Sequence, residues 1–448
     1  MNLVKKSPFL TENAFLRYVV FSALYFAEGL NMGLLFVGLP AWLAMKGKTP
    51  TEIGGFAVAC ALPWTFKFVV APLMDRYTYL PMGRKRPWVL VGQLGLMISL
   101  IFMAYLPDPL SNMQQFNIAA FVVSAFGAIH DAATDGLAVD TVPADQQART
   151  NGFMGGARMI GSSLALALGS WLLNKYGFTA EILGIACLIG LAILVPFFLR
   201  ERPGEKLVPW TAGAASREAK KMQVRDWTTL FRSLYGAFRL RDSLIIIVLL
   251  FITQGAYNYF ETLLPLFTVK ETGWTNIIYA RFFATADLTG GIAGMLIGGY
   301  LIEKFGRKRM MNGYFLLIIL ITVGLAFIKP FWTNSHGMVA FIITYRWLNA
   351  FAKIGLFAIA MECCLKKVSA SQFTIYMTMG AIGSLGGATL IGPIKEHFSW
   401  EITFCSFAAM IALAWVILQF LNLNKLAAQI TALEEKDVKR EVVALVEY

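Results

Sequence analysis

The sequence predicts an all-α membrane protein with twelve transmembrane helices in two six-helix bundles. Of the 448 residues, 57% are hydrophobic and only 15% are charged, whereas soluble domains carry about 25% charged residues. Apolar stretches of about 20 residues, each long enough to span the hydrocarbon core of a bilayer, recur along the chain. A polar segment near the middle separates six of these stretches from six others.

Each apolar stretch is interpreted as one membrane-spanning helix. The first bundle lies within residues 1–199, with helices expected at 15–43, 53–74, 87–106, 116–138, 150–172 and 180–199. The second lies within residues 243–422, with helices expected at 243–269, 279–302, 309–328, 338–361, 371–393 and 401–422. Residues 200–242 are interpreted as a cytoplasmic central loop, and residues 423–448 as a cytoplasmic amphipathic tail.

The basic residues are distributed unevenly between the loops. With the N-terminus inside, the cytoplasmic loops and tails hold 28 of the 39 Lys and Arg residues, and the opposite loops hold six. Positive loops on the cytoplasmic side are the usual topology signal, so we expect a multi-pass protein of the cytoplasmic (inner) membrane with both termini inside. The net charge of +12 is therefore not interpreted as nucleic-acid binding.

The sequence contains no convincing enzyme or cofactor signature. The five Cys residues have neither metal-ligand spacing nor a disulfide framework. HExxH, Walker-loop and nucleophile-elbow motifs are not found. We therefore expect no catalytic residue, no metal and no cofactor, and an ion gradient as the driving force. The first apolar segment is too long for a signal peptide and is interpreted as a retained helix.

The two halves repeat a pattern of charges after their second helices. The first half has DRYTYLPMGRKR (Asp75 to Arg86), and the second has EKFGRKR (Glu303 to Arg309). A second echo pairs YFAEG, which contains Glu28, with NYFETL, which contains Glu261. Two six-helix repeats with a site between them are the plan of the major facilitator superfamily, which this chain resembles.

The repeated charges predict a cytoplasmic gate. An acid at a helix end can make a charge-assisted contact with a basic cluster in one conformation and lose it in another. The alternative is that the basic clusters serve only as topology signals. The candidate gating residues are Asp75, Arg76, Gly83, Arg84 and Arg86 in the first half, and Glu303, Gly306, Arg307 and Arg309 in the second.

Three segments within residues 20–165 resemble the muropeptide permease (AmpG) family more specifically. They are KFVVAPLMDRYTYLPMGRKRPW from Lys67, HDAATDGLAVDTVPAD from His130 and GARMIGS from Gly156. The wider group is the peptide–acetyl-CoA–drug transporter family. The resemblance implies proton-driven movement of a bulky, often anionic solute. The chain lacks the extra helices of the longer muropeptide permeases, and it has Glu28 where they have a small residue.

Charged residues inside the first bundle indicate a polar pathway. Lys67 lies in the second apolar helix, where burying an ammonium costs at least a few kcal/mol. By helix rise, Lys67, Asp131 and Arg158 all lie about 10–12 Å from the cytoplasmic ends of their helices. We expect Asp131 and Asp135 to form an ion-pair network with Arg158 and Lys67. The alternative is that these charges only neutralise one another and stabilise the bundle.

Glu28 is the first candidate for a proton carrier. It lies about 20 Å from the cytoplasmic end of its helix, with no obvious cationic neighbour in the sequence. Burial disfavours the charged form of a carboxyl group, so Glu28 is expected to bind a proton near neutral pH. Asp131 is the second candidate, and Asp135 belongs to the same proton-coupling group. The alternative is a neutral Glu28 that is hydrogen-bonded to a neighbouring helix.

Polar residues at helical spacing form two stripes in the second bundle, one on the helix expected at 243–269 and one on the helix expected at 338–361. Both stripes are candidates for solute binding. On a lipid-facing surface such stripes would be costly, so we expect them to face the central cavity. Arg346 and Lys353 could hold carboxylates or phosphates, and the alternative is that they pair with Glu261 and Asp287. With Lys67 and Arg158, the substrate-binding candidates are Gln254, Tyr257, Asn258, Glu261, Arg346, Asn349 and Lys353.

Taken together, these features predict a proton-coupled secondary active transporter. It would import a bulky anionic, muropeptide-like solute across the cytoplasmic membrane by alternating access. The expected partners are the solute, protons and the lipid bilayer, with no nucleic acid and a monomeric state. Alternatives are a siderophore or acetyl-CoA transporter of the same family, a non-transporting membrane receptor, and a lipid scramblase.

Overall fold

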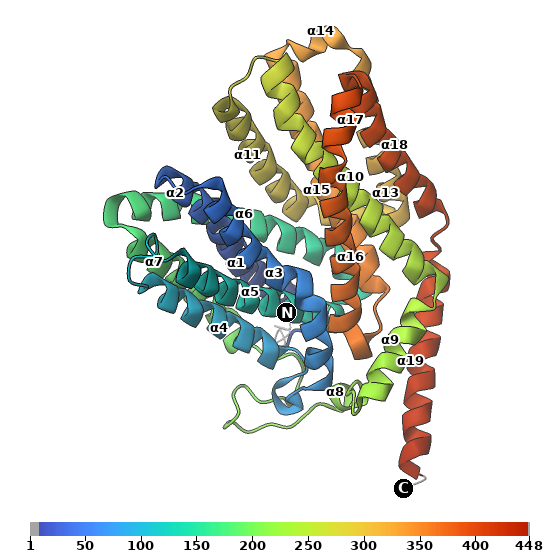
Figure 1. Cartoon of the computed structure of the whole chain (residues 1–448). Helices are drawn as coiled ribbons and strands as arrows, with labels where there is room; N and C mark the ends of the chain where they lie inside the picture. The colour runs from blue at the N-terminus through green and yellow to red at the C-terminus, as the bar shows by residue number, and fades with distance from the viewer. Residues whose placement is uncertain (1–8, 447–448) are drawn as a thin grey trace, which may run out of the picture. The chain divides into compact units, whose positions relative to one another are not determined.

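Membrane-spanning helices make up most of the computed structural model (Figure 1). The structure describes residues 9–446, without the side chains of 276–277 and 436–446. Within these residues, eleven segments are long and apolar enough to cross a membrane. A twelfth helix, α15 (Ser335–Glu362), is 28 residues long but contains Arg346 and Lys353. The predicted all-α fold with twelve spanning helices is confirmed.

The first six spans precede the central loop. They are α1 (Ala14–Gly33) continued by a π-helical turn (Leu34–Gly38) and α2 (Leu39–Met45), then α3 (Pro50–Arg76), α4 (Arg86–Ala104), α5 (Met113–Thr141), α6 (Gln147–Tyr176) and α7 (Phe178–Phe197). The central loop contains two short helices, α8 (Arg217–Lys221) and α9 (Trp227–Phe238). Residues 1–8, at the start of the predicted first segment, lie outside the described residues.

The last six spans follow the central loop. They are α10 (Arg241–Glu271), α11 (Asn276–Ala293) continued by a π-helical turn (Gly294–Gly298) and α12 (Gly299–Phe305), α13 (Arg307–Phe327), α15, α16 (Ser369–Thr389) with α17 (Ile391–His397), and α18 (Trp400–Gln419). A short helix, α14 (Lys329–Trp332), precedes α15, and α19 (Leu423–Val446) covers most of the predicted tail. Residues 447–448 of that tail lie outside the described residues.

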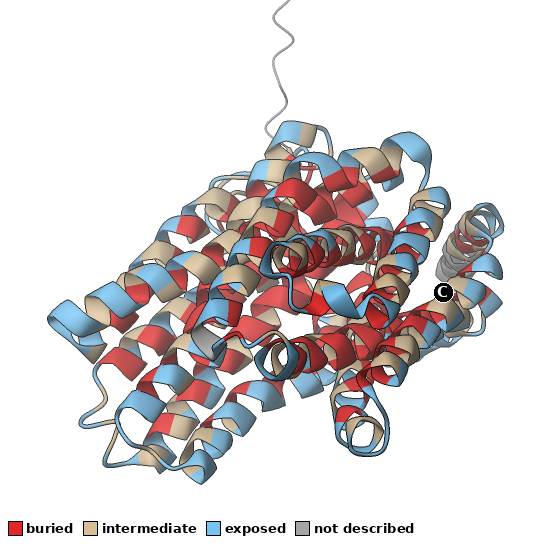
Figure 2. Ribbon diagram, turned by 90° about the horizontal axis from the view of Figure 1, so that it is seen from above, coloured by how far each residue is buried: buried red, intermediate tan, exposed pale blue. Residues whose placement is uncertain are grey.

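The helices form two compact units. Unit 1 contains residues 1–146, 157–234 and 365–374, so it includes most of α6 and the first residues of α16. Unit 2 contains residues 147–156, 235–364 and 375–448, so it includes the first ten residues of α6. The buried residues of the helices lie on faces that pack against neighbouring helices (Figure 2).

Aromatic and aliphatic side chains fill the interior of each unit. In unit 1, the rings of Phe56 and Phe116 stack at 5.1 Å within a cluster of buried apolar residues. In unit 2, the ring of Phe260 stacks on that of Phe407 at 4.2 Å. Burial of such side chains stabilises each unit, because it removes large apolar areas from water or lipid and packs them densely.

Small residues allow α1 and α6 to approach closely in unit 1. A Cβ added to Gly29 would lie only 2.1 Å from the main-chain oxygen of Arg158. Glycine at such a position lets two helix backbones come into contact, as is common in membrane proteins. The consequence for the site is that Glu28, the residue before Gly29, lies beside the α6 turn that carries Arg158.

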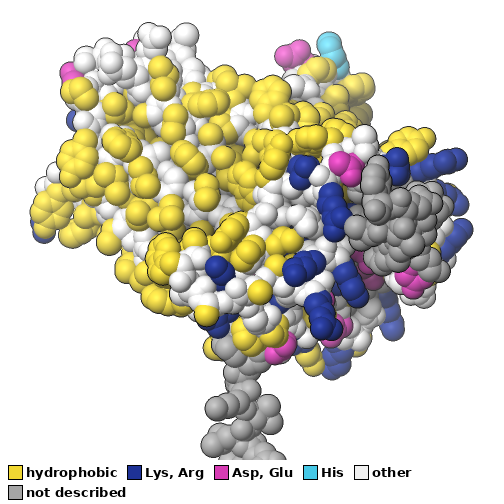
Figure 3. Space-filling view, turned by 90° about the horizontal axis from the view of Figure 1, so that it is seen from below, with side chains coloured by type: hydrophobic (Ala, Val, Ile, Leu, Met, Phe, Trp, Pro, Cys, Tyr) yellow, Lys and Arg dark blue, Asp and Glu magenta, His cyan; other side chains and the backbone are white. Residues whose placement is uncertain are grey.

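Large apolar side chains are also exposed on the outer faces of the spans. Phe66 and Val69 of α3, for example, are 53% and 56% exposed. Such exposure is expected for side chains that contact lipid tails rather than water. Figure 3 shows a broad area of hydrophobic side chains on one face of the molecule and a separate area where Lys and Arg gather.

Candidate transport site

A buried ion pair joins α3 and α5 within unit 1. Lys67 Nζ lies 2.6 Å from Asp131 Oδ2, and both residues are buried. The Lys67 ammonium also lies 5.5 Å from the centre of the Trp64 ring. A carboxylate at hydrogen-bond distance offsets much of the cost of removing the ammonium from water. This pair was expected, because the two residues lie at the same depth.

A second ion pair joins α1 and α6. Arg158 Nη2 lies 3.1 Å from Glu28 Oε1, and Glu28 is only 1% exposed. The close approach of the helices at Gly29 brings the two charges together. Glu28, which has no obvious cationic neighbour in the sequence, therefore has one in the structure. Arg158 is distant in the sequence, and only the packing of α6 on α1 makes it a neighbour.

Tyr25 connects the two ion pairs. Its hydroxyl donates a short hydrogen bond to Asp135, and its ring centre lies 5.0 Å from the guanidinium carbon of Arg158. Asp135 is therefore linked to Arg158 through Tyr25, whereas a shared network of direct ion pairs was expected. Tyr25 was not among the candidate residues. It lies one helical turn before Glu28, on the same side of α1, and this spacing is the signal that could have identified it.

We call Tyr25, Glu28, Lys67, Asp131, Asp135 and Arg158 the unit 1 charge cluster. Further polar groups lie close to it. Asn31 on α1 is fully buried and neither of its amide atoms has a hydrogen-bond partner, and Nδ1 of the buried His130 has none either. Buried polar groups in proteins normally have partners. These atoms therefore mark a polar interior in which a solute group or water would be stabilised.

A second charge cluster, built around the buried Arg346, lies in unit 2. Arg346 Nη1 lies 2.6 Å from Glu261 Oε1, and Arg346 also forms a short ion pair with Asp287. Lys353 Nζ lies 3.9 Å from the same Glu261 oxygen, and Asn349 donates to it at 3.4 Å. These five residues form the unit 2 charge cluster. The alternative pairing that was considered for Arg346, with Glu261 and Asp287, is the one found.

The four polar residues of α10 that were candidates for solute binding face two different helices. Asn258 donates a 2.8 Å hydrogen bond to the main-chain oxygen of Ser384 on α16, and Gln254 packs against Gly380 of the same helix. Tyr257 is buried, its hydroxyl has no hydrogen-bond partner, and the Lys353 ammonium lies 5.7 Å from its ring centre. Glu261 and Tyr257 therefore face the cations of α15, whereas Gln254 and Asn258 face α16.

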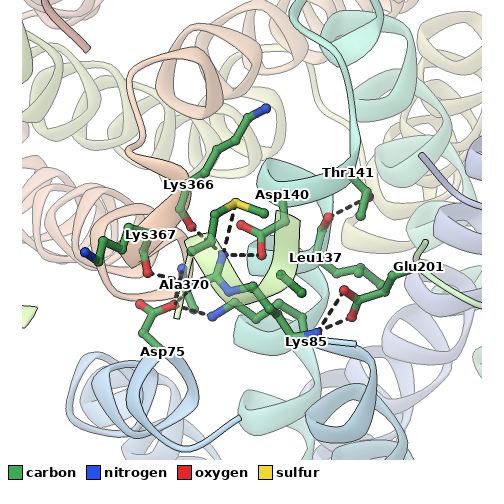
Figure 4. A network of polar contacts seen from close by, with 12 residues as sticks. Asp75, Lys85, Leu137, Asp140, Thr141, Glu201, Lys366, Lys367 and Ala370 are labelled. Atoms are coloured by element: carbon green, nitrogen blue, oxygen red, sulfur yellow. Dashed lines mark hydrogen bonds and ion pairs between the residues drawn. The ribbon is translucent and has the colours of Figure 1, made fainter. Parts of the chain in front are cut away.

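The carboxylate at the end of α3 contacts the start of α16 within unit 1 (Figure 4). Asp75 accepts hydrogen bonds from the backbone N–H and the hydroxyl of Ser371, at 2.8 and 2.6 Å. It also forms a short ion pair with Lys85. Arg84 lies 2.8 Å from Asp140 and donates to the main-chain oxygens of Lys366 and Lys367. An anion near the first turn of a helix is stabilised by the helix dipole and by the unpaired N–H groups.

The loop between α3 and α4 is bound by the central loop. The carboxylate of Glu201 accepts from the backbone N–H groups of Arg84, Lys85 and Arg86, at 2.9, 2.8 and 2.6 Å. Gly83 has φ +108°, and a Cβ there would lie 2.5 Å from Glu201 Cδ. The Arg86 guanidinium is buried and donates to four main-chain oxygens of residues 196–207. Arg86 therefore anchors the central loop.

In the second half, the acid at the end of the second span and the basic cluster after it have different partners from those in the first half. Glu303, at the end of α12, accepts from the backbone N–H of Arg149 at 2.8 Å and lies 2.8 Å from its guanidinium. The prediction had placed Glu303 beside the cluster that follows Gly306. In the structure, Arg307 of that cluster forms a short ion pair with Glu362 of α15.

Two other gating candidates lie outside these networks. Arg309 is exposed. Arg76 donates to the main-chain oxygen of Val224 at 3.4 Å, and its guanidinium carbon lies 5.3 Å from the ring centre of Tyr77. In the part of the chain that the structure describes, no group of three or more His, Cys, Asp or Glu side chains is arranged to hold a metal ion.

Bacterial proteins named as permeases or transporters resemble the chain over most of its length. It is 24% identical over 403 residues to the "Anhydromuropeptide permease" of Escherichia coli (strain K12), a match that covers 90% of this chain and 79% of that protein. It is 20% identical over 405 residues to the "Putative transporter AmpG 3" of Rickettsia prowazekii (strain Madrid E), covering 84% of this chain and 89% of the relative.

Solved transporter structures share the fold. The fucose:proton symporter FucP of E. coli superposes with a TM-score of 0.64 at 13% identity, covering 90% of this chain and 98% of that one. The human organic anion transporter MFSD10 (TETRAN) gives the same TM-score, identity and coverage. The family model described as "Major Facilitator Superfamily" matches residues 21–388. This chain is thus a multi-pass membrane transporter that belongs to the major facilitator superfamily.

Proposed function

We propose that the protein is a proton-coupled symporter that imports a muropeptide-like solute across the cytoplasmic membrane by alternating access. In this proposal it works as a monomer with both termini in the cytoplasm. The relative named an anhydromuropeptide permease, matched over 90% of this chain, supports the solute class. None of the relatives reported above is named for a siderophore or for acetyl-CoA, so the muropeptide class is preferred.

The main support for proton coupling is the balance of acidic and basic side chains in the unit 1 charge cluster. Among its described residues, three carboxylates (Glu28, Asp131 and Asp135) accompany two cations (Lys67 and Arg158). An unbalanced charge is costly in a low-dielectric interior. The cluster is neutral when one carboxylate holds a proton. Glu28 is the preferred carrier, because its partner Arg158 could move to a solute anion and leave Glu28 to be protonated.

The unit 2 charge cluster is balanced and suits the solute. Glu261 and Asp287 accompany Arg346 and Lys353. A carboxylate of the solute could take the place of Glu261 at Arg346, which can bind it through two parallel N–H groups. The guanidinium carbon of Arg346 also lies 4.3 Å from the ring centre of Phe283, a contact that holds the cation in position.

The proposed gate consists of two carboxylates, each of which binds the first turn of another helix. Asp75 binds the first turn of α16, and Glu303 binds that of α6. In both cases an acid at the end of a span, in corresponding places of the two halves, caps another span. We propose that these contacts hold in one conformation and break in the other. Arg84 and Arg149, which bind near them, would take part in the same change.

Uptake into proteoliposomes tests the proposal. Vesicles with an inward proton gradient would be supplied with an anhydromuropeptide, and ferric siderophore and acetyl-CoA would be tested in parallel. We expect muropeptide uptake that is accelerated by the gradient and accompanied by proton entry. In Glu28→Gln, which cannot bind and release a proton, gradient-driven uptake should be lost, whereas exchange of solute at equal concentrations should persist.

Glu12→Gln is the matched control, because Glu12 is an exposed carboxyl group in unit 1 outside the cluster. It should transport like the parent protein. Binding of the muropeptide without flux in either condition would favour a receptor. Uptake of acetyl-CoA or the siderophore alone would reject the proposed solute class while leaving the proton mechanism in place. Gradient-driven uptake at the parent rate in Glu28→Gln would reject Glu28 as the carrier.

A further inference from the structure

An exposed aromatic strip continues the outer face of α3 onto α9. Along α3 the exposed apolar residues Phe66, Val69 and Leu73 follow helical spacing, and Tyr77 comes next in the same series. Tyr77 is 55% exposed, and its ring meets that of Trp227, the first residue of α9, edge to face at 6.1 Å. The apolar outer face of a membrane span therefore passes without a break onto α9.

The two aromatic residues of α9 lie on its free face. Trp227 and Phe231 are one turn apart, their rings stack at 6.0 Å, and Phe231 is 58% exposed. The adjoining side of the helix carries Leu230 and Leu234, which are buried against the protein. The two aromatic rings thus remain largely exposed, although α9 buries the leucines beside them.

Local contacts hold α9 in this orientation. Asp226 accepts from the backbone N–H of Thr229 at 2.6 Å, an interaction that caps the start of the helix. Hydrogen bonds from the Thr228 hydroxyl and the Thr229 backbone lower the pKa of Asp226 to about 2, so the carboxylate remains charged. Arg76, at the end of α3, donates to the main-chain oxygen of Val224 just before α9.

Exposed cations flank the strip. Arg225 precedes Asp226, and Arg232 follows Phe231. Aromatic rings beside arginine are typical of segments that lie in the headgroup region of a membrane, where the ring enters the interface and the guanidinium meets phosphate. A protein partner would need no continuity with the lipid-facing side of α3, so the continuity and the positive charge together favour lipid.

We propose that the end of α3 and the start of α9 form a docking surface for anionic phospholipid. Tyr77, Trp227 and Phe231 lie in the headgroup region, and Arg225 and Arg232 contact lipid phosphates. The surface fixes the central loop to the membrane surface where α3 ends. This inference is independent of the solute and of proton coupling.

Fluorescence quenching at position 231 tests the proposal. Phe231→Cys and Lys220→Cys would carry an NBD label in a background in which the exposed Cys187 and the half-buried Cys405 are replaced by Ala. Lys220 is an exposed residue of α8 and serves as the aqueous reference. In nanodiscs, the label at 231 should be shielded from iodide and quenched by lipids with a headgroup-proximal doxyl group. The label at 220 should show the reverse.

The role of the arginines is tested with the same label. Doxyl-phosphatidylglycerol should quench the label at position 231 about tenfold more effectively than doxyl-phosphatidylcholine does, since each arginine near the surface favours anionic lipid. The Arg225→Gln/Arg232→Gln double variant should lose this preference while the shielding from iodide remains. Equal iodide quenching at 231 and 220 would overturn the proposal. Shielding at 231 that persists in detergent without lipid and rises with protein concentration would assign the strip to a second protein copy instead.

Discussion

At the scale of single residues, Tyr25 has the most specific predicted effect. It links Asp135 by its hydroxyl and Arg158 by its ring. Tyr25→Phe keeps the ring against Arg158 but removes a hydrogen bond to a carboxylate. Because hydrogen bonds to charged groups contribute about 1.5–3 kcal/mol, we expect the rate of gradient-driven uptake to fall by about tenfold or more and its pH profile to shift. Tyr25→Leu should add a loss of the Glu28–Arg158 contact.

The matched control is Tyr314→Phe. Tyr314 is buried in unit 2, and its hydroxyl has no hydrogen-bond partner. Its removal should leave both the rate and the pH profile unchanged. If Tyr25→Phe also retained the parent profile in initial-rate measurements, Tyr25 would be a packing residue without a part in proton coupling.

At the scale of elements, the central loop should respond to pH near neutrality. Burial and, to a smaller extent, the nearby Glu201 carboxylate raise the pKa of Glu205 to about 7, although the hydrogen bond from the backbone N–H of Arg202 opposes them. The folded loop therefore binds a proton more tightly than an unfolded one. Between about pH 4.5 and 7 the docked loop loses stability as the pH rises, and above about pH 7 it remains at its weakest.

Hydrogen–deuterium exchange of residues 200–216 would measure this effect. After correction for intrinsic rates, exchange should be faster at pH 8 than at pH 6 in the parent, and Glu205→Gln should remove the difference. Glu218, whose side chain is 75% exposed, provides the control variant Glu218→Gln. Unchanged pH dependence in Glu205→Gln would show that another group is responsible.

At the scale of the whole molecule, the proposed gate makes a prediction for the buried thiol of Cys364. This residue is 4% exposed and lies just before the start of α16. Asp75→Asn removes the charge that binds Lys85 and weakens the contact with Ser371. The conformation in which the Asp75 contacts are broken should become more populated. We therefore expect maleimide labelling of Cys364 to accelerate by about tenfold, which is the effect of losing one charge-assisted contact.

Glu303→Gln should have a similar effect, because it weakens the corresponding contact with Arg149. Asp145→Asn, a change of an exposed acid in the loop between α5 and α6, is the control. Mass spectrometry of the labelled peptide would give the rates. Equal labelling in all three variants and the parent would argue that these carboxylates only stabilise a static structure.

The contacts that could be predicted from the sequence are those that depend on how deep each residue lies in the membrane. Lys67 and Asp131 were expected at one level of the membrane, and their atoms lie 2.6 Å apart. The partners of Glu28 and Glu303 were not predictable, because depth does not determine which way a helix face points. Nor does any sequence pattern indicate that Glu201 would occupy the backbone N–H groups that follow Gly83.

The sequence by itself determined the all-α membrane fold, the twelve spans and the presence of charges inside them, because apolar length and composition are local properties. The tertiary structure alone decided which of these polar groups meet: Glu28 with Arg158, Asp135 with Tyr25, and Glu303 with Arg149. The physical reason is that each contact depends on the rotation and approach of two helices. Those are set by packing along whole interfaces, such as the one at Gly29, and not by the residues that form the pair.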